Sequence, residues 1–190
     1  MLTAMKKRLG AGFLKLCGWK AVGELPQGLR KAVVVSAPHT SNWDYIFAML
    51  VFWSFGRKVR FLAKKELFWG PLGWLMRKTG GIPVNRKSPG GVVGDVVREI
   101  QKSDDFILMV PVEGTRKRVE RWKTGFYRIA LSAKVPLLIG FMDYKKKEAG
   151  FGPMVNPCGD LAEDFPKLLE FYRGVTPKHP EFWNENPRLS

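Results

Sequence analysis

One histidine and one aspartate stand in a spacing that suits proton transfer. The segment His39-Thr40-Ser41-Asn42-Trp43-Asp44 follows a β-branched run and precedes an apolar stretch. Five residues turn a helix by about 500°, so His39 and Asp44 would point apart inside one helix. They meet only if His39 lies in the turn before a helix and Asp44 reaches back from its first turn. An aspartate on one imidazole nitrogen leaves the other nitrogen free to take a proton from a hydroxyl.

A structural role explains part of the same segment. Ser41 followed three residues later by Asp44 also fits a capping box, and the helix dipole favours an acidic first turn. The residues alone therefore leave catalysis and helix capping both open for Asp44. Neither capping nor the apolar pattern requires His39.

A second polar cluster, Glu113-Gly114-Thr115-Arg116, comes directly after the apolar run 106–111. Gly114 permits a ligand to approach the backbone closely, and Arg116 can grip a phosphate with two hydrogen bonds. An ordinary turn before a solvated basic segment is the alternative. Because sites in parallel α/β sheets form beyond the carboxyl ends of strands, we expect this cluster and His39 to share a crevice.

The elements that must position these residues alternate along the chain. Apolar runs predict strands at 31–36, 59–63, 81–85, 106–111 and 135–142. Helical spacing predicts helices near residue 42, over 65–79 (broken at Pro71), around 92–100, after Thr124 and after Asp160. Strands with continuous apolar runs, alternating with helices, predict an α/β domain with a mostly parallel central sheet flanked by helices.

The ends of the chain differ from this domain in composition. Residues 1–24 predict an amphipathic basic helix whose Leu, Phe and Trp side chains suit an in-plane position in an anionic membrane. Packing of this helix on the domain is the alternative. We assign residues 25–175 to the α/β domain and 176–190 to a polar, Pro-rich C-terminal tail. Apolar runs are too short for a spanning helix, and no signal-peptide cleavage site is evident.

The composition of the chain restricts the classes of partner and metal that it can bind. The 190-residue chain has 32 Lys and Arg against 17 Asp and Glu, a formal net charge of +15. That excess predicts an anionic partner: nucleic acid, a membrane surface or a phosphorylated substrate. Two cysteines, Cys17 and Cys158, and two histidines, His39 and His179, exclude a disulfide framework and a Cys- or His-rich metal centre. We therefore expect no metal and a reducing, cytosol-facing location.

Five segments follow one another along the chain: His39 with Asp44, Lys64-Lys65-Glu66-Leu67, Val84-Asn85-Arg86, Glu113-Gly114-Thr115-Arg116 and Val135-Pro136. In this order they resemble the motifs of the glycerolipid acyltransferase family, of which lysophosphatidate acyltransferase is the familiar member. The resemblance covers roughly residues 31–142. The chain departs from the family pattern at Pro38 and Asn85, which bears on the identity of the acceptor.

The resemblance implies transfer of a fatty acyl group from acyl-CoA or acyl carrier protein to the hydroxyl of a lysophospholipid-like acceptor. His39 would be the general base and Asp44 would orient it, with no acyl-enzyme and no bound cofactor. The implied substrate-binding residues are Lys64, Arg86, Glu113, Gly114, Thr115 and Arg116. The expected location is the cytoplasmic face of a membrane, as a peripheral protein on anionic lipid.

Three other functions fit parts of the sequence. A nucleic-acid binder fits the charge, but no RNP-like, zinc-finger or helix-turn-helix signature is present and the basic residues are dispersed, so we expect no nucleic-acid partner. A non-catalytic lipid-binding protein and a thioesterase that directs His39 at water remain as alternatives.

Overall fold

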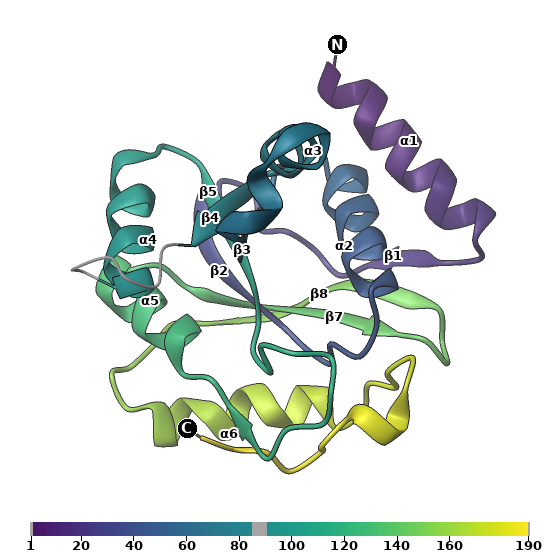
Figure 1. Ribbon diagram of the computed structural model, residues 1–190. Coiled ribbons are helices and arrows are strands. Elements are labelled where there is room, and N and C mark those ends of the chain that lie inside the picture. Colours follow the sequence, from purple (N-terminus) through teal and green to yellow (C-terminus); the bar gives the residue numbers. More distant parts are fainter. Residues whose placement is uncertain (1, 85–90, 190) are drawn as a thin grey trace.

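A seven-stranded sheet forms the centre of the molecule. The computed structural model describes residues 2–84 and 91–189 (Figure 1). The strands run in the order β1-β8-β7-β2-β5-β3-β4, and every neighbouring pair is parallel except β7 with β8. The prediction of a mostly parallel sheet is confirmed. The strand bounds are β1 Lys20–Val22, β2 Lys31–Ser36, β3 Arg60–Lys64, β4 Gly81–Val84, β5 Phe106–Pro111, β7 Leu137–Asp143 and β8 Glu148–Val155.

The apolar runs build both faces of this sheet because side chains alternate along a strand. In β2, Val33 and Val35 face one core cluster, whereas Val34 faces the other. In β5, Leu108 and Ile107 divide between the faces in the same way. A strand buried on both faces needs apolar residues at every position, which is why these runs show no polar alternation.

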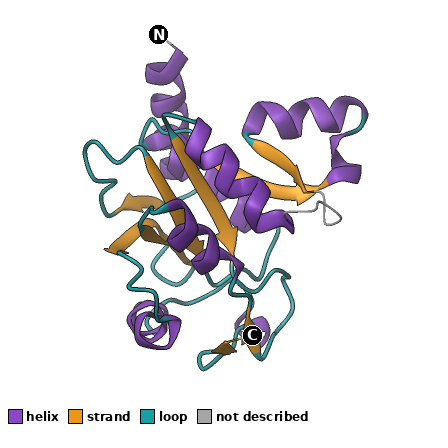
Figure 2. Ribbon diagram, turned by 90° about the vertical axis from the view of Figure 1, so that its left-hand side faces the viewer, coloured by secondary structure: helices purple, strands orange, loops and turns teal. Residues whose placement is uncertain are grey.

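Helices cover both faces (Figures 1 and 2). Leu14, Phe47 and Met76, one from each of the first three α-helices, pack on the Val34 side. The other three pack on the Val33 side, through residues such as Ile100, Phe126 and Leu168. The helix bounds are α1 Leu2–Leu16, α2 Trp43–Ser54, α3 Gly70–Thr79, α4 Gly91–Lys102, α5 Gly125–Ala133 and α6 Leu161–Tyr172, with 3-10 turns η1 Lys65–Phe68 and η2 Pro180–Phe182.

The break predicted at Pro71 is present. The turn η1 ends at Phe68, and α3 restarts with Pro71 in its first turn, where a missing backbone N–H costs nothing. Gly80 ends α3 in the left-handed conformation, with φ of 104°. The chain then enters β4 directly, which places β4 beside β3.

The N-terminal helix is shorter than the 24 residues expected. Helix α1 ends at Leu16, Gly18 adopts a φ of +72°, and the chain continues into β1, which pairs with β8. The expected helix was too long because residues 20–22 gain their backbone hydrogen bonds from a distant strand. Helix α1 lies against α2 at Gly10, where a Cβ would come within 2.7 Å of the Leu50 carbonyl oxygen.

Residues 176–189 lie against the domain. Trp183 is 5% exposed and its ring lies 6.1 Å from that of Trp122. Strand β9 (Arg188–Leu189) pairs with β6 (Arg121–Trp122) in a small second sheet. This segment is polar by composition, yet its one tryptophan belongs to the apolar core.

Candidate active site

His39 lies in the loop between β2 and α2, at the carboxyl edge of the sheet. Its Nδ1 is 3.2 Å from Oδ2 of Asp44, the second residue of α2. The imidazole is 19% exposed, whereas the carboxylate is 4% exposed. The aspartate therefore reaches back from the first helical turn to a histidine in the preceding loop, which is the one arrangement that permits contact at this spacing.

The carboxylate of Asp44 has further donors. Its Oδ2 also accepts hydrogen bonds from the backbone N–H groups of Thr40 (2.9 Å) and Ser41 (2.8 Å), and its Oδ1 accepts one from the Tyr144 hydroxyl (2.6 Å). Burial acts to raise the pKa of Asp44, but hydrogen bonds from His39, Tyr144 and Ser41 outweigh it and hold the pKa below its usual value. One carboxylate thus holds the loop and contacts the imidazole, so the capping and His-orienting interpretations are compatible.

Glu113 joins the second polar cluster to the first. Strands β2 and β5 are paired with Ser36 opposite Pro111, so the loops that follow them start level with each other. Oε1 of the buried Glu113 accepts a hydrogen bond of 2.9 Å from the backbone N–H of His39. Its Oε2 is buried and has no partner among the described residues. Burial raises the pKa of Glu113 to about 7, against the lowering effect of the His39 hydrogen bond.

The rest of this cluster is open to solvent. Gly114 has a φ of +67°, and its N–H donates to the Pro111 carbonyl at 3.1 Å. Thr115 and Arg116 are exposed on the same loop. The Lys123 ammonium lies beside it, since a Cβ built on Gly114 would approach Nζ to 2.7 Å. A cationic loop therefore adjoins the buried Glu113.

One of the expected cations lies on a strand further along the sheet. Lys64 is exposed at the end of β3, at the same carboxyl edge as His39. Arg86 lies outside the described residues. The structure therefore brings His39, Asp44 and Glu113 into direct contact, places Gly114 to Arg116 on the adjoining loop, and leaves Lys64 two strands away from β2.

Residues from segments distant in sequence also contact the loop that carries His39. The sequence patterns did not predict these contacts. Tyr144, just after β7, donates to Asp44 from 100 residues away. The backbone N–H of His179 donates to Oγ1 of Thr40 at 3.2 Å, and the Lys178 ammonium lies 5.3 Å from the Trp43 ring centroid. Tyr144 is followed by a run of lysines and His179 stands in a Pro-rich segment, so neither carried a pattern that could reveal it.

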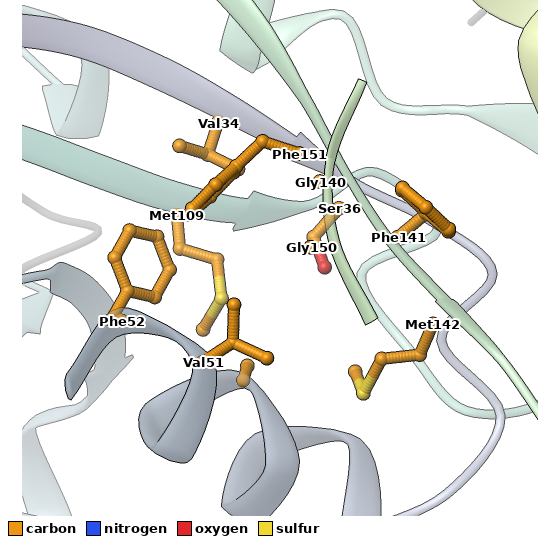
Figure 3. A pocket seen from close by; sticks show the side chains of 11 residues that line it. Val34, Ser36, Val51, Phe52, Met109, Gly140, Phe141, Met142, Gly150 and Phe151 are labelled. Atoms are coloured by element: carbon orange, nitrogen blue, oxygen red, sulfur yellow. The ribbon is translucent and has the colours of Figure 1, made fainter. Parts of the chain in front are cut away.

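The aromatic residues of α2 and of the η1–α3 segment divide between core and surface. Phe47 and Phe52 of α2 are buried, whereas Trp69 and Trp74 beside and on α3 are 86% and 60% exposed. Figure 3 shows a small cavity between α2 and the sheet, next to Ser36, Phe52 and Met109. The volume of this cavity is about 20 Å³, which has room for about one water molecule and not for an acyl chain.

One group in the described part of the chain has metal-ligand spacing: Cys158, Glu163 and Asp164. The Asp164 carboxylate there already accepts hydrogen bonds from the Tyr127 hydroxyl (2.8 Å) and the Lys167 ammonium (3.1 Å). These donors occupy the sides a cation would need, so the group has the character of a helix N-terminal anchor.

The chain matches known proteins in sequence and in fold. The family model described as Acyltransferase matches residues 22–138, more than half of the chain. The chain belongs to the acyltransferase family. A 1-acyl-sn-glycerol-3-phosphate acyltransferase from Cocos nucifera is 30% identical over 96 residues, which cover 47% of this chain and 31% of that protein. The match thus spans less than a third of the length of this relative.

A solved acyltransferase has the same fold. The crystal structure of the 1-acyl-sn-glycerophosphate (LPA) acyltransferase PlsC from Thermotoga maritima superposes with a TM-score of 0.63 at 20% identity, covering 91% of this chain and 78% of that chain. The resemblance to the acyltransferase family is therefore confirmed by a family model and by fold. Within residues 2–84 and 91–189, no helix is both long and apolar enough to cross a membrane.

Proposed function

We propose that this acyltransferase moves a fatty acyl group from an acyl thioester to the hydroxyl of a lysophospholipid-like acceptor. The observation that carries the proposal is the 3.2 Å contact between His39 and Asp44 at the sheet rim, with the Glu113 loop bonded to the His39 backbone. The Cocos nucifera and Thermotoga maritima proteins, both acyltransferases of 1-acylglycerol phosphates, support this acceptor class.

The proposed chemistry is direct transfer. The free imidazole nitrogen of His39 takes the proton of the acceptor hydroxyl, and the hydroxyl oxygen attacks the thioester carbonyl carbon. Asp44, held by the Thr40 and Ser41 amides, orients the ring and stabilises the imidazolium. The tetrahedral intermediate then collapses, the C–S bond breaks, and the leaving thiolate takes the proton from the imidazolium. An ester and a thiol result, with no change in oxidation state.

The developing oxyanion needs donors at the rim. The Gly114 amide, one candidate, already donates to the Pro111 carbonyl, which leaves the ammonium groups of Lys64 and Lys123 as the stronger candidates. We assign the anionic headgroup of the acceptor to the exposed Arg116 and to Arg86. Guanidinium groups suit this role because they can bind phosphate oxygens in pairs.

Acyl-CoA and acyl carrier protein are the proposed donors, as co-substrates rather than bound cofactors. Both are anionic, so the net charge of +15 favours each of them equally. Measuring transfer with each donor at matched acyl chain length would separate the two.

We further propose that the protein works as a peripheral protein at the cytoplasmic face of an anionic membrane. Helix α1 exposes Met5, Leu9, Phe13 and Leu16 along one stripe, between Lys6, Lys7, Arg8 and Lys15. Deleting residues 1–24 would also remove β1 and the buried Trp19, so substitutions in the stripe are the cleaner test.

The decisive experiment compares two histidines. His39→Ala should lower transfer by about a hundredfold or more, the usual contribution of a general base. His179→Ala is the matched control, because His179 contacts Thr40 through its backbone N–H, which alanine keeps. Thiol release from acyl-CoA should depend on a lysophosphatidate acceptor. Near-parental turnover in folded His39→Ala protein, or thiol release that ignores the acceptor, would refute the proposal.

A further inference from the structure

A basic cavity lies at the end of the α1–α2–α3 layer. Its volume is about 510 Å³, and it lies between α1, the carboxyl ends of α2 and α3, and the start of β3. Met49, Trp53 and Val59 form an apolar part of its wall, and no acidic side chain lines it among the described residues. The cationic side chains that line it are Lys6, Arg57, Lys58, Arg60, Arg77 and Lys78.

Internal partners neutralise only a small part of this charge. Arg57 bonds to the Leu29 carbonyl and lies 3.4 Å from Asp105. Lys6, Arg77 and Lys78 face aromatic rings at 5.9, 5.6 and 4.3 Å. The carboxyl ends of two helices supply only about half a negative charge each.

Lys58 and Arg60 are the cations of the cavity without a partner. Both are exposed, and neither has an acidic neighbour within ion-pair distance in the described part of the chain. An anion is therefore the ligand that this cavity suits.

Exposed apolar side chains are concentrated on the helical layer that holds the cavity. Of the fourteen large apolar side chains exposed in the described residues, eleven lie on α1, α2 and the η1–α3 segment. The other three, Leu131, Met154 and Phe182, are scattered elsewhere. Trp69 and Trp74 are 86% and 60% exposed, and tryptophan is enriched at membrane–water interfaces.

We propose that the cavity binds the phosphate headgroup of an anionic glycerophospholipid in a bilayer, while the exposed side chains of α1 and the η1–α3 segment enter the lipid beside it. The proposal rests on the membrane association proposed above. The headgroup site does not depend on the transfer chemistry, because the cavity and His39 are separated by the length of a strand. Strand β3 begins at the cavity and ends at the edge of the sheet that carries His39. The cavity and the catalytic site therefore lie at opposite edges of the sheet.

The test measures partitioning of the full-length protein onto vesicles of phosphatidylcholine with phosphatidylglycerol. Lys58→Gln with Arg60→Gln should weaken partitioning by about tenfold or more, since each basic residue near an anionic surface contributes substantially. Lys102→Gln with Arg128→Gln, on α4 and α5, removes the same charge from the opposite layer and should have a much smaller effect. Equal losses in the two pairs would show a net-charge effect and overturn the proposal.

Three further measurements with the same vesicle assay identify the ligand. Trp69→Ser with Trp74→Ser should also weaken partitioning by about tenfold, and Leu131→Ser with Met154→Ser should not. Pure phosphatidylcholine should bind weakly, and millimolar inorganic phosphate should not release protein from anionic vesicles. Release by free phosphate, or a dimer in solution that the tryptophan substitutions dissociate, would overturn the bilayer as occupant.

Measurements of acyl transfer distinguish a failure of this proposal from a failure of the proposed function. Lys58→Gln with Arg60→Gln should leave kcat on a monodisperse short-chain acceptor unchanged. A loss of that activity would make the cavity part of the reaction site and overturn the inference. If the parent protein transfers no acyl group yet the partitioning results hold, the proposed function fails and the lipid site stands.

Tyr144 carries a second, independent inference. Its hydroxyl bonds to the Asp44 oxygen that faces away from His39, at 2.6 Å. The tyrosine is itself fixed, since its ring packs edge-on against Trp19 at 4.9 Å and its N–H donates to the Thr176 carbonyl at 2.8 Å. We infer that Tyr144 is a positioning residue, which holds the Asp44 carboxylate in the rotation that presents Oδ2 to the imidazole.

Tyr144→Phe tests this inference because it keeps the ring packing and removes only the hydroxyl. We expect kcat to fall by about tenfold, with both KM values unchanged and the Nδ1 proton resonance of His39 displaced. Tyr127→Phe is the matched control, since it removes a hydroxyl that donates to the buried Asp164 at 2.8 Å. Parental kcat with an unmoved resonance in folded Tyr144→Phe protein would overturn the positioning role.

Discussion

Replacing Glu113 by glutamine should change how stability depends on pH. The carboxyl is 4% exposed, its Oε2 has no partner among the described residues, and burial raises its pKa from 4.5 to about 7. A carboxyl with a raised folded-state pKa contributes stability fully below the unfolded pKa, and this stability is lost as pH rises through the folded pKa. Glutamine cannot ionise, yet its Oε1 can still accept the His39 N–H.

The magnitude follows from that difference in pKa. At 1.36 kcal/mol per pH unit, a change from 4.5 to about 7 corresponds to about 3 kcal/mol. The stability of Glu113→Gln relative to the parent protein should therefore rise by about 3 kcal/mol between pH 4.5 and pH 8. A pH-independent difference in the free energy of unfolding between the glutamate and glutamine proteins does not affect this change with pH.

Urea unfolding of both proteins at intervals across this pH range measures the effect. The midpoint and the slope m should be followed together, because an altered m would signal a changed unfolded state rather than a changed carboxyl. Contributions from His39 and other shared groups largely cancel in the difference. Stability curves that stay parallel from pH 4.5 to pH 8 would refute the view that Glu113 is held protonated by burial.

Other substitutions test the loop and α1. Arg116→Ala should raise the KM of an anionic acceptor by about tenfold at constant kcat, and Lys117→Ala should raise this KM less. If the two variants had the same KM, the headgroup role of Arg116 would be contradicted. Gly114→Ala should destabilise the protein by about 1 kcal/mol in urea, because alanine strains a φ of +67°. Leu14→Ala, at a side chain 1% exposed, should cost about 3 kcal/mol, whereas Leu16→Ala, at 81%, should change stability by less than about 0.5 kcal/mol; similar losses would mean that α1 does not pack as described.

Local patterns in the sequence determined most of the architecture. The continuous apolar runs in β2, β5 and β7 and the helical spacing in α4 depend on periodicity within a few residues, and they predicted an α/β domain directly. The contact of His39 with Asp44 was predictable for the same reason, since both residues lie within one turn of a helix start. Glu113 was predicted to lie nearby because parallel strands end at one edge of a sheet.

Only the tertiary structure decided the contacts between distant segments. Strands β1 and β8 are short or glycine-containing, and each exists because a neighbouring strand completes its backbone hydrogen bonds. Tyr144 reaches Asp44 across 100 residues, and residues 176–179 close over the same loop. The cation-lined cavity likewise gathers residues 6, 57–60 and 77–78 from two helices, a loop and the start of a strand. No local periodicity encodes such contacts, because they arise from how whole elements pack together.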